Sequence, residues 1–143
     1  MTFTKTDYNF WEKAKEMAEQ STFRQFHIGC VAVYRGQIVA TGVNSYKTHP
    51  VQHELNFKHR DFSFDVPQSV EGLHAEMDCI LELARVRPDI NWSKVSLYIY
   101  RVRRDGELGI CRPCAACSAL IREKGIRNIY YTVDGGYAYE FWI

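Results

Sequence analysis

The sequence predicts an α/β protein in which helices pack on the faces of a mixed β-sheet. Three segments carry apolar residues at helical spacing, and four or five others have the pattern of strands. After an opening helix and hairpin the order is strand, helix, strand, helix, strand, which is typical of a sheet with parallel strands. With 143 residues and no internal repeat or linker, we expect one domain over residues 1–143 and a four- to five-stranded sheet.

The composition is that of a packed globular protein, with 46% hydrophobic and 14% aromatic residues. The formal net charge of +1 gives no overall attraction to nucleic acids or membrane surfaces, although a local basic groove is compatible with it. The first residues lack an apolar leader segment, and no apolar run approaches membrane-spanning length. We therefore expect a cytoplasmic protein with no membrane partner.

The first 43 residues predict a helix followed by a β-hairpin. Residues 7–20 place apolar side chains on one face at a period of 3.6 residues, and Thr6 or Asp7 can cap the start of this helix. Residues 28–34 and 38–43 are apolar and β-branched. The short Arg-Gly-Gln connection between them is typical of an antiparallel hairpin.

Residues 46–72 form a long polar and aromatic segment before the next helix. A connection of this length in a small domain is more often functional than structural, and residues 51–59 can form one or two helical turns within it. Its three histidines, His49, His53 and His59, are most simply solvated or locally hydrogen-bonded, with a second metal site as the alternative.

The second half of the chain predicts two helices and two or three strands. Helical spacing over residues 73–86 and 113–124 alternates with strand patterns over residues 95–100 and 126–133. A final edge strand over residues 137–143 follows a turn with two glycines. Helix N-termini in such units gather at the carboxyl ends of parallel strands, so we expect the starts of the two helices to meet at one edge of the sheet.

The two helix starts carry residue types that commonly bind zinc. Residues 74–76 read His-Ala-Glu, and residues 113–117 read Pro-Cys-Ala-Ala-Cys. The two cysteines are three residues apart in the first turn, so both sulfurs can face one ion, and the helix dipole favours their thiolate form. With a histidine nitrogen, three ligands leave one tetrahedral position for water, as in catalytic zinc sites. Glu76 is the candidate proton acceptor.

Other interpretations of the cysteines remain open. Five cysteines, three of them within seven residues, fit metal binding in a reducing compartment better than a disulfide framework. The Cys-x-x-Cys-x-x-Cys run that begins at Cys111 could seed an iron–sulfur cluster or, with His74, a structural zinc site. Neither scheme uses Glu76. Cys30 and Cys79 lie on apolar faces and are expected in the core.

These motifs resemble those of the zinc-dependent cytidine and deoxycytidylate deaminase superfamily. Its signature is His-x-Glu followed by Pro-Cys-x-x-Cys, which residues 74–76 and 113–117 match. Residues 28–44 resemble the family's first hairpin and residues 125–131 its later strand, so the resemblance extends over about residues 8–133. It implies a three-layer α-β-α cytidine deaminase-like fold.

The resemblance also implies one Zn²⁺ per chain, held by His74, Cys114 and Cys117. Glu76 would take a proton from water and deliver it to the ring and to the leaving amine. Four further residues are candidate substrate contacts. They are Asn44 at the end of the hairpin, Ala75 through its backbone, Phe26 through its ring and Lys47 through its amine.

Seven basic side chains flank these segments in the sequence. Each of these side chains is either a solvated charge at the surface or a group that binds a substrate phosphate. They are Lys47, Lys58, Arg60, Arg101, Arg103, Arg104 and Arg112.

Together these features favour hydrolytic deamination of a cytosine nucleotide, with deoxycytidine monophosphate (dCMP) preferred over cytidine or deoxycytidine. Within the family, a histidine as first ligand is found in deoxycytidylate deaminases and in adenosine deaminases of transfer RNA, and residues 45–50 resemble small deoxycytidylate-type enzymes. The near-neutral charge fits a mononucleotide better than a polynucleotide. The alternatives are a deaminase of cytosine or adenine in single-stranded DNA or RNA, and a non-enzymatic zinc-stabilised interaction module. The resemblance also implies a homo-oligomer.

The end of the chain bears on this choice. If the turn at residues 134–136 makes the last strand antiparallel to its neighbour, the topology resembles cytidine-type enzymes, whereas family members that edit polynucleotides have a helix between these strands. The eleven residues after Thr132 leave no room for such a helix and a strand. This length argues against an editing enzyme.

Overall fold

The computed structural model describes residues 2–47, 49–61 and 72–143. Every predicted helix and strand is found within two residues of its expected bounds. In chain order the elements are α1 (Lys5–Ala18), β1 (His27–Tyr34), β2 (Gln37–Val43), α2 (Pro50–His59), α4 (Ala75–Val86), the short 3₁₀ helix η1 (Trp92–Lys94), β3 (Val95–Val102), β4 (Leu108–Gly109), α5 (Ala115–Lys124), β5 (Asn128–Val133) and β6 (Gly136–Phe141).

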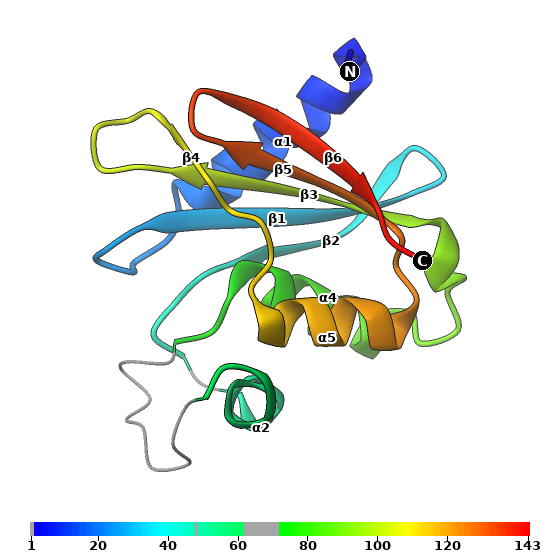
Figure 1. The fold of residues 1–143 in the computed structure, drawn as a ribbon. Helices are drawn as coiled ribbons and strands as arrows, with labels where there is room; N and C mark the ends of the chain where they lie inside the picture. The colour runs from blue at the N-terminus through cyan, green and yellow to red at the C-terminus, as the bar shows by residue number, and fades with distance from the viewer. Residues whose placement is uncertain (1, 48, 62–71) are drawn as a thin grey trace.

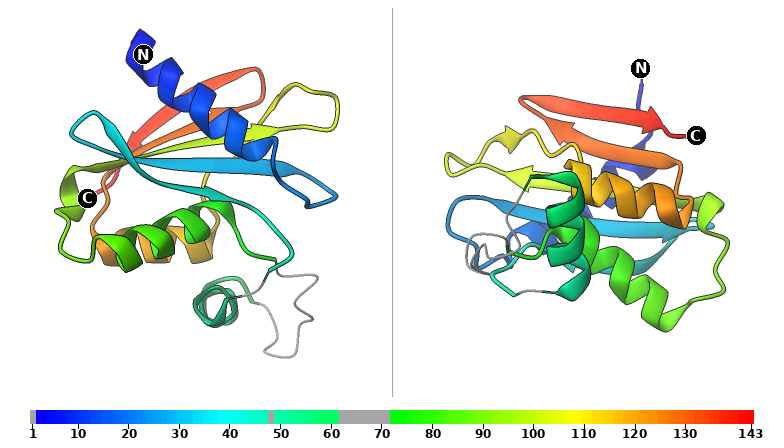
Figure 2. Two further views of the ribbon diagram at one scale, coloured as in Figure 1. Left: turned by 180° about the vertical axis from the view of Figure 1, so that it is seen from behind. Right: turned by 60° about the horizontal axis from the view of Figure 1, so that its bottom comes forward.

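A twisted sheet lies at the centre, with α1 on one face and α4 and α5 side by side on the other (Figure 1). Helix α2 packs against α5 on the side away from the sheet. Views from behind and with the bottom of the molecule brought forward show the same arrangement (Figure 2). The predicted three-layer α-β-α architecture is therefore confirmed.

The strand order is β2-β1-β3-β5-β6, and the two-residue β4 adds a sixth strand by pairing with the end of β3. β1 is antiparallel to β2 and β3, whereas β3 and β5 are parallel. The last strand, β6, is antiparallel to β5. An antiparallel last strand is the topology expected above for cytidine-type enzymes.

Helix α1 begins earlier than predicted, and both predicted caps are wrong. Thr4 is the N-cap: its Oγ1 accepts a hydrogen bond from the Asp7 backbone N–H at 3.1 Å, and its own N–H donates to Asp7 Oδ2 at 2.9 Å. This reciprocal capping box satisfies two backbone donors at once, which a cap at Thr6 would not. The other oxygen of Asp7 accepts a hydrogen bond from the hydroxyl of Tyr98 at 2.6 Å and ties α1 to β3.

Two glycines let helices lie directly on the sheet. A Cβ added to Gly42 in β2 would lie 2.3 Å from the carbonyl oxygen of Ala75 in α4. On the other face, a Cβ added to Gly29 in β1 would lie 2.0 Å from the carbonyl oxygen of Ala14 in α1. The first turn of α4 is thus seated against β2 at a distance that only glycine permits.

The main apolar core lies between the sheet and the pair α4 and α5. Cys30 and Cys79 are both fully buried in it, as predicted. A second cluster, rich in aromatic rings, lies under α1, where the rings of Tyr98 and Tyr130 stack at 4.2 Å. Burial of this kind supplies most of the free energy that holds the helices on the sheet.

The long segment between β2 and α4 is closed at its base. Ser45 and Leu73 exchange two backbone hydrogen bonds, of 3.0 and 2.9 Å. The predicted one or two helical turns form a ten-residue helix, α2, capped by His49, whose Nδ1 accepts a hydrogen bond from the Val51 N–H at 3.1 Å. Residues 62–71 of the segment lie outside the described part of the chain.

Candidate active site

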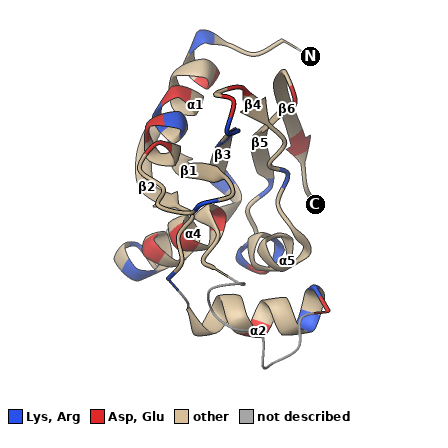
Figure 3. Ribbon diagram, turned by 90° about the vertical axis from the view of Figure 1, so that its left-hand side faces the viewer, with Lys and Arg blue, Asp and Glu red and all other residues tan. Residues whose placement is uncertain are grey.

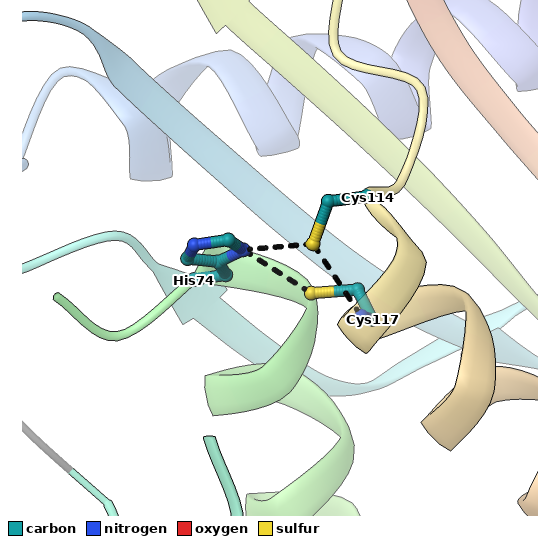
Figure 4. Close-up of side chains that lie close together, drawn as sticks. All are labelled: His74, Cys114 and Cys117. Atoms are coloured by element: carbon teal, nitrogen blue, oxygen red, sulfur yellow. Dashed lines mark hydrogen bonds between the residues drawn. The ribbon is translucent and has the colours of Figure 1, made fainter. Parts of the chain in front are cut away.

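The N-termini of α4 and α5 lie together, as predicted, and bring three metal-binding side chains to one point (Figure 4). His74 is the N-cap of α4, Cys114 is the N-cap of α5, and Cys117 lies in the first turn of α5. Nδ1 of His74 lies 3.4 Å from the Sγ atom of each cysteine. The three donor atoms all lie within 4.8 Å of one another.

Negative charge in this cluster is concentrated on Cys114. A hydrogen bond with Cys117 lowers the pKa of Cys114 to about 3, with further help from His74 and against the effect of burial. The same hydrogen bond, with burial, raises the pKa of Cys117. Burial works against charge on His74, but the contact with Cys114 outweighs it and raises the pKa of His74.

Glu76 is buried beside the cluster, with 5% of its surface exposed. Burial raises the pKa of its carboxyl group, and the charge of His74 opposes that shift. A smaller interaction with Cys117 also opposes the rise in the pKa of Glu76. Residues two apart in a helix do not share a face. They converge here because His74 is the cap, with extended backbone angles (φ −79°, ψ 150°), and only Glu76 is helical.

A cavity of about 260 Å³ opens at this cluster. Its lining includes the predicted substrate contacts Phe26, Asn44 and Ala75 together with Glu76. Lys47 is not among the described residues that line it, so the structure does not bring this predicted contact to the site. The full lining consists of Phe26, Ile28, Asn44, Arg60, His74, Ala75, Glu76, Arg101, Ile110, Cys111, Arg112 and Cys114.

Asn44 is 3% exposed, and its side-chain amide is already hydrogen-bonded within the protein. Its Oδ1 accepts from the Ile28 backbone N–H at 2.9 Å, and its Nδ2 donates to the Phe26 carbonyl at 3.0 Å. The residue therefore ties the end of β2 to the start of β1, and in doing so it shapes the cavity wall that carries the ring of Phe26.

Three of the seven flanking basic residues, Arg60, Arg101 and Arg112, line the cavity. Arg112 is paired with the carboxylate of Glu140. Arg101 has no carboxylate partner within the described residues: its Nη1 donates to the Ile110 carbonyl at 3.1 Å, its guanidinium lies 5.2 Å from the centre of the Phe26 ring, and its buried Nε has no hydrogen-bond partner. Arg101 is thus a cation in the cavity with unused donor capacity.

The cluster of one nitrogen and two sulfurs fits one Zn²⁺. Zinc accepts imidazole nitrogen and thiolate sulfur in tetrahedral sites, and three protein ligands are the number found in catalytic sites. The low pKa of Cys114 supplies one thiolate without further change. We therefore name His74, Cys114 and Cys117 as the residues that would hold the ion.

A family model of the cytidine and deoxycytidylate deaminase zinc-binding region matches residues 4–133. The chain belongs to this family. It is a zinc-dependent hydrolytic deaminase, as the His-x-Glu and Pro-Cys-x-x-Cys motifs predicted. Family membership therefore favours an enzyme over a non-enzymatic zinc module.

Solved structures of other deaminases share the fold. A dCMP deaminase from the cyanophage S-TIM5 is 20% identical, with a TM-score of 0.62 over 91% of this chain and 84% of that one. A cytidine deaminase from Burkholderia pseudomallei is 16% identical, with a TM-score of 0.62 over 99% of this chain and 93% of that one. At these identities the likeness shows the fold and leaves the substrate open.

A search of curated proteins finds no match. Within the part of the chain that the structure describes, no helix combines the length and apolar character needed to span a membrane.

The remaining metal hypotheses for this deaminase have no support in the structure. Cys111 lies outside the donor group, with its Sγ 3.2 Å from Oγ1 of Thr132. No second group of three such donors occurs among the described residues, which include His49, His53 and His59. An iron–sulfur cluster, a three-cysteine zinc site and a histidine site in the inserted segment each need such a group.

Two buried residues of α2 that connect to His74, Gln52 and Asn56, were not among the predicted site residues. Gln52 Oε1 accepts a hydrogen bond from the His74 backbone N–H at 3.1 Å. The available signal was the spacing of Gln52, Asn56 and Arg60, which are four residues apart and therefore share one face of the predicted helix.

Proposed function

We propose that this deaminase converts the cytosine base of a pyrimidine mononucleotide to uracil, with dCMP as the preferred substrate. The observation that carries the proposal is Arg101, a cation without a carboxylate partner in the described structure, in the same cavity as the zinc-binding cluster and Glu76. Arginine binds phosphate through charge-assisted hydrogen bonds. A nucleoside offers no anionic group to match it.

In this proposal Glu76 moves protons and the cavity wall holds the base. A zinc ion held by His74, Cys114 and Cys117 would lower the pKa of a bound water molecule to about 7. Glu76 accepts a proton from the water and delivers it to ring N3, while the water oxygen attacks C4. Glu76 then takes the proton of the new C4 hydroxyl group and passes it to the exocyclic amine, which leaves as ammonia as the C4 carbonyl forms. Cytosine and water thus become uracil and ammonia, with no other reactant needed.

The remaining contacts follow from the lining of the cavity. The ring of Phe26 lies at the wall, where it can stack on the base, and the backbone of Ala75 lies next to both His74 and Glu76. Asn44 holds this wall in place and offers its remaining lone pair to the sugar. The antiparallel β6 supports the choice of a free nucleotide, because it is the arrangement of cytidine-type enzymes. A related fold has been solved in complex with dCMP and dUMP.

To test the proposal, the purified protein is incubated with a panel of nucleosides and nucleotides. Turnover is measured as the loss of the amino-pyrimidine absorbance. We expect turnover of dCMP with a higher kcat/KM than that of deoxycytidine or cytidine. Turnover of free bases alone, or of nothing in the panel, would refute the proposal.

A second candidate function, deamination within single-stranded DNA or RNA, is favoured by one observation. A second cleft, of about 290 Å³, shares Phe26 with the active-site cavity and is lined by Arg24, His27, Arg103 and Arg104. Basic residues lie at the end of β3 beside β4 (Figure 3). A polynucleotide backbone could pass from one cavity to the other. Against it, Arg103 is partly neutralised by Asp105, at 2.9 Å.

A gel-shift experiment with single-stranded oligonucleotides at rising salt separates the two functions. A mononucleotide enzyme gives no shift at physiological salt. A polynucleotide enzyme gives a shift that weakens steeply with salt, and that Arg24→Ala and Arg104→Ala each weaken. Cytoplasmic location, one domain over residues 1–143 and self-association stay predictions, the last to be checked by light scattering.

A further inference from the structure

Helix α2 directs a line of polar side chains toward the candidate zinc ligand. Gln52, Asn56 and Arg60 are four residues apart, so they follow one face of the helix and its C-terminal cap. Gln52 and Asn56 are each 0% exposed. Amide side chains are rarely buried completely, and a helix that only covered its neighbour would present apolar residues there.

These side chains form a continuous hydrogen-bonded ladder that begins and ends on His74. Gln52 Oε1 accepts from the His74 backbone N–H at 3.1 Å, and Gln52 Nε2 donates to Asn56 Oδ1 at 2.8 Å. Arg60 Nη1 donates to the same Oδ1 at 3.2 Å and lies 3.3 Å from Nε2 of the His74 ring. The ladder therefore holds the backbone of His74, and its guanidinium end lies beside the ring.

The two ends of the ladder contact two different parts of His74, its backbone and its ring. The bond from Gln52 fixes the backbone of His74, which is the extended cap of α4 and has no side-chain capping bond of its own. The guanidinium of Arg60 lies beside the Nε2 edge of the ring, and Nδ1 on the other edge faces Cys114 and Cys117. Helix α2 is itself packed against α5, which carries both cysteines.

We infer that Gln52, Asn56 and Arg60 are positioning residues of the zinc centre. Helix α2 would then help to orient the zinc ligand His74. Residues that orient a metal ligand from the second coordination sphere typically change metal affinity by about 10- to 100-fold. The inference rests on the zinc centre of the proposed function. The test measures the affinity of the protein for zinc. The result therefore does not depend on whether dCMP is the correct substrate.

The test measures the dissociation constant for zinc by competition with a chromophoric chelator. Gln52→Leu and Asn56→Leu are expected to weaken zinc binding roughly 10- to 100-fold, and to change the absorption spectrum of the Co²⁺-loaded protein. Lys58→Ala is the matched control on the same helix, since this side chain is 56% exposed and forms an ion pair with Glu54 at the surface. It should bind zinc like the unmodified protein.

A conservative variant separates hydrogen bonding from packing. Asn56→Asp keeps the oxygen that accepts from Gln52 and Arg60, and it should restore zinc binding to within a few-fold. Asn56→Leu keeps the size of the side chain and should not. If Gln52→Leu does not fold, as judged by circular dichroism, the two Asn56 variants decide alone. Zinc affinities unchanged by Asn56→Leu, or equally reduced by both Asn56 variants, would overturn the inference.

Discussion

Arg112 donates two hydrogen bonds to Glu140, from Nε at 2.6 Å and from Nη2 at 3.0 Å. The pair joins the segment just before Cys114 to the last strand, β6. Glu140 also accepts hydrogen bonds from the Tyr131 hydroxyl at 2.5 Å and from Trp142 Nε1 at 3.1 Å. Because Arg112 lines the active-site cavity, the end of the chain holds one of its walls in place.

The contribution of Glu140 to stability should disappear in acid. The hydrogen bond from Arg112 is the main cause that lowers the pKa of Glu140 from 4.5 to about 2. A carboxylate with a lowered pKa stabilises the folded state fully above the unfolded pKa, and this stabilisation is lost as the pH falls toward 2. The difference in unfolding free energy between the unmodified protein and Glu140→Gln should therefore shrink between about pH 4.5 and pH 2. Denaturant unfolding at a series of pH values measures it, and a constant difference would contradict the assignment.

Glu76→Gln should keep zinc and lose turnover. The amide preserves the size of the side chain in its buried position but accepts no proton, and general acid–base groups contribute about 10²–10⁴-fold to rate. Zinc content by atomic absorption and turnover of dCMP are the two readouts. Glu82→Gln is the control, because Glu82 lies on the same helix in an exposed pair with Arg85. Turnover that survives in Glu76→Gln removes this residue from the mechanism.

Two buried cysteines close to each other in the chain should behave differently on substitution. Cys117→Ala removes one of the three donors and should abolish stoichiometric zinc binding, whereas Cys111→Ala should retain about one zinc per chain. Cys111 contacts Thr132 and lies outside the donor group. Metal analysis after dialysis gives the answer. Loss of zinc from both variants would restore the three-cysteine site as the better interpretation.

Arg101→Ala should lower kcat/KM for dCMP roughly 10- to 100-fold, the effect expected for one charge-assisted hydrogen bond. The same variant should change kcat/KM for deoxycytidine much less, since the nucleoside has no phosphate. Steady-state kinetics with both substrates measure the ratio. Arg101→Lys keeps the charge and should recover part of the loss. Equal losses for both substrates would mean that Arg101 supports the Phe26 wall and does not bind phosphate.

Gly42→Ala and Gly29→Ala should both destabilise the fold, by about 1–3 kcal/mol through overpacking. Only Gly42→Ala should also weaken zinc binding, because its added Cβ meets the first turn of α4, next to His74. The Cβ added by Gly29→Ala meets α1, on the opposite face of the sheet. Unfolding midpoints and chelator competition provide the two measurements. Equal zinc affinities in the two variants would show that α4 adjusts without moving its cap.

The sequence by itself determined the order of elements, the family and the candidate zinc ligands. Each of these depends on neighbours within a few residues: apolar periodicity, and the spacing of the two cysteines at the start of α5. The helix boundaries fell within two residues of prediction for the same reason. Even the wrong cap of α1 is a local error, since Thr4 and Asp7 together make a better cap than either predicted residue.

Only the tertiary structure decided which distant side chains meet in the cavity. Seven basic residues looked alike in sequence, yet Arg101 faces the cavity and Lys47 does not, because strand order and loop path place them. Asn44 proved to be bonded to the start of β1, and Gln52 to His74, across separations of 16 and 22 residues. Such contacts are set by how the sheet and helices pack as a whole. The spacing of Gln52, Asn56 and Arg60 marks a shared helix face, but it does not say which residue that face meets.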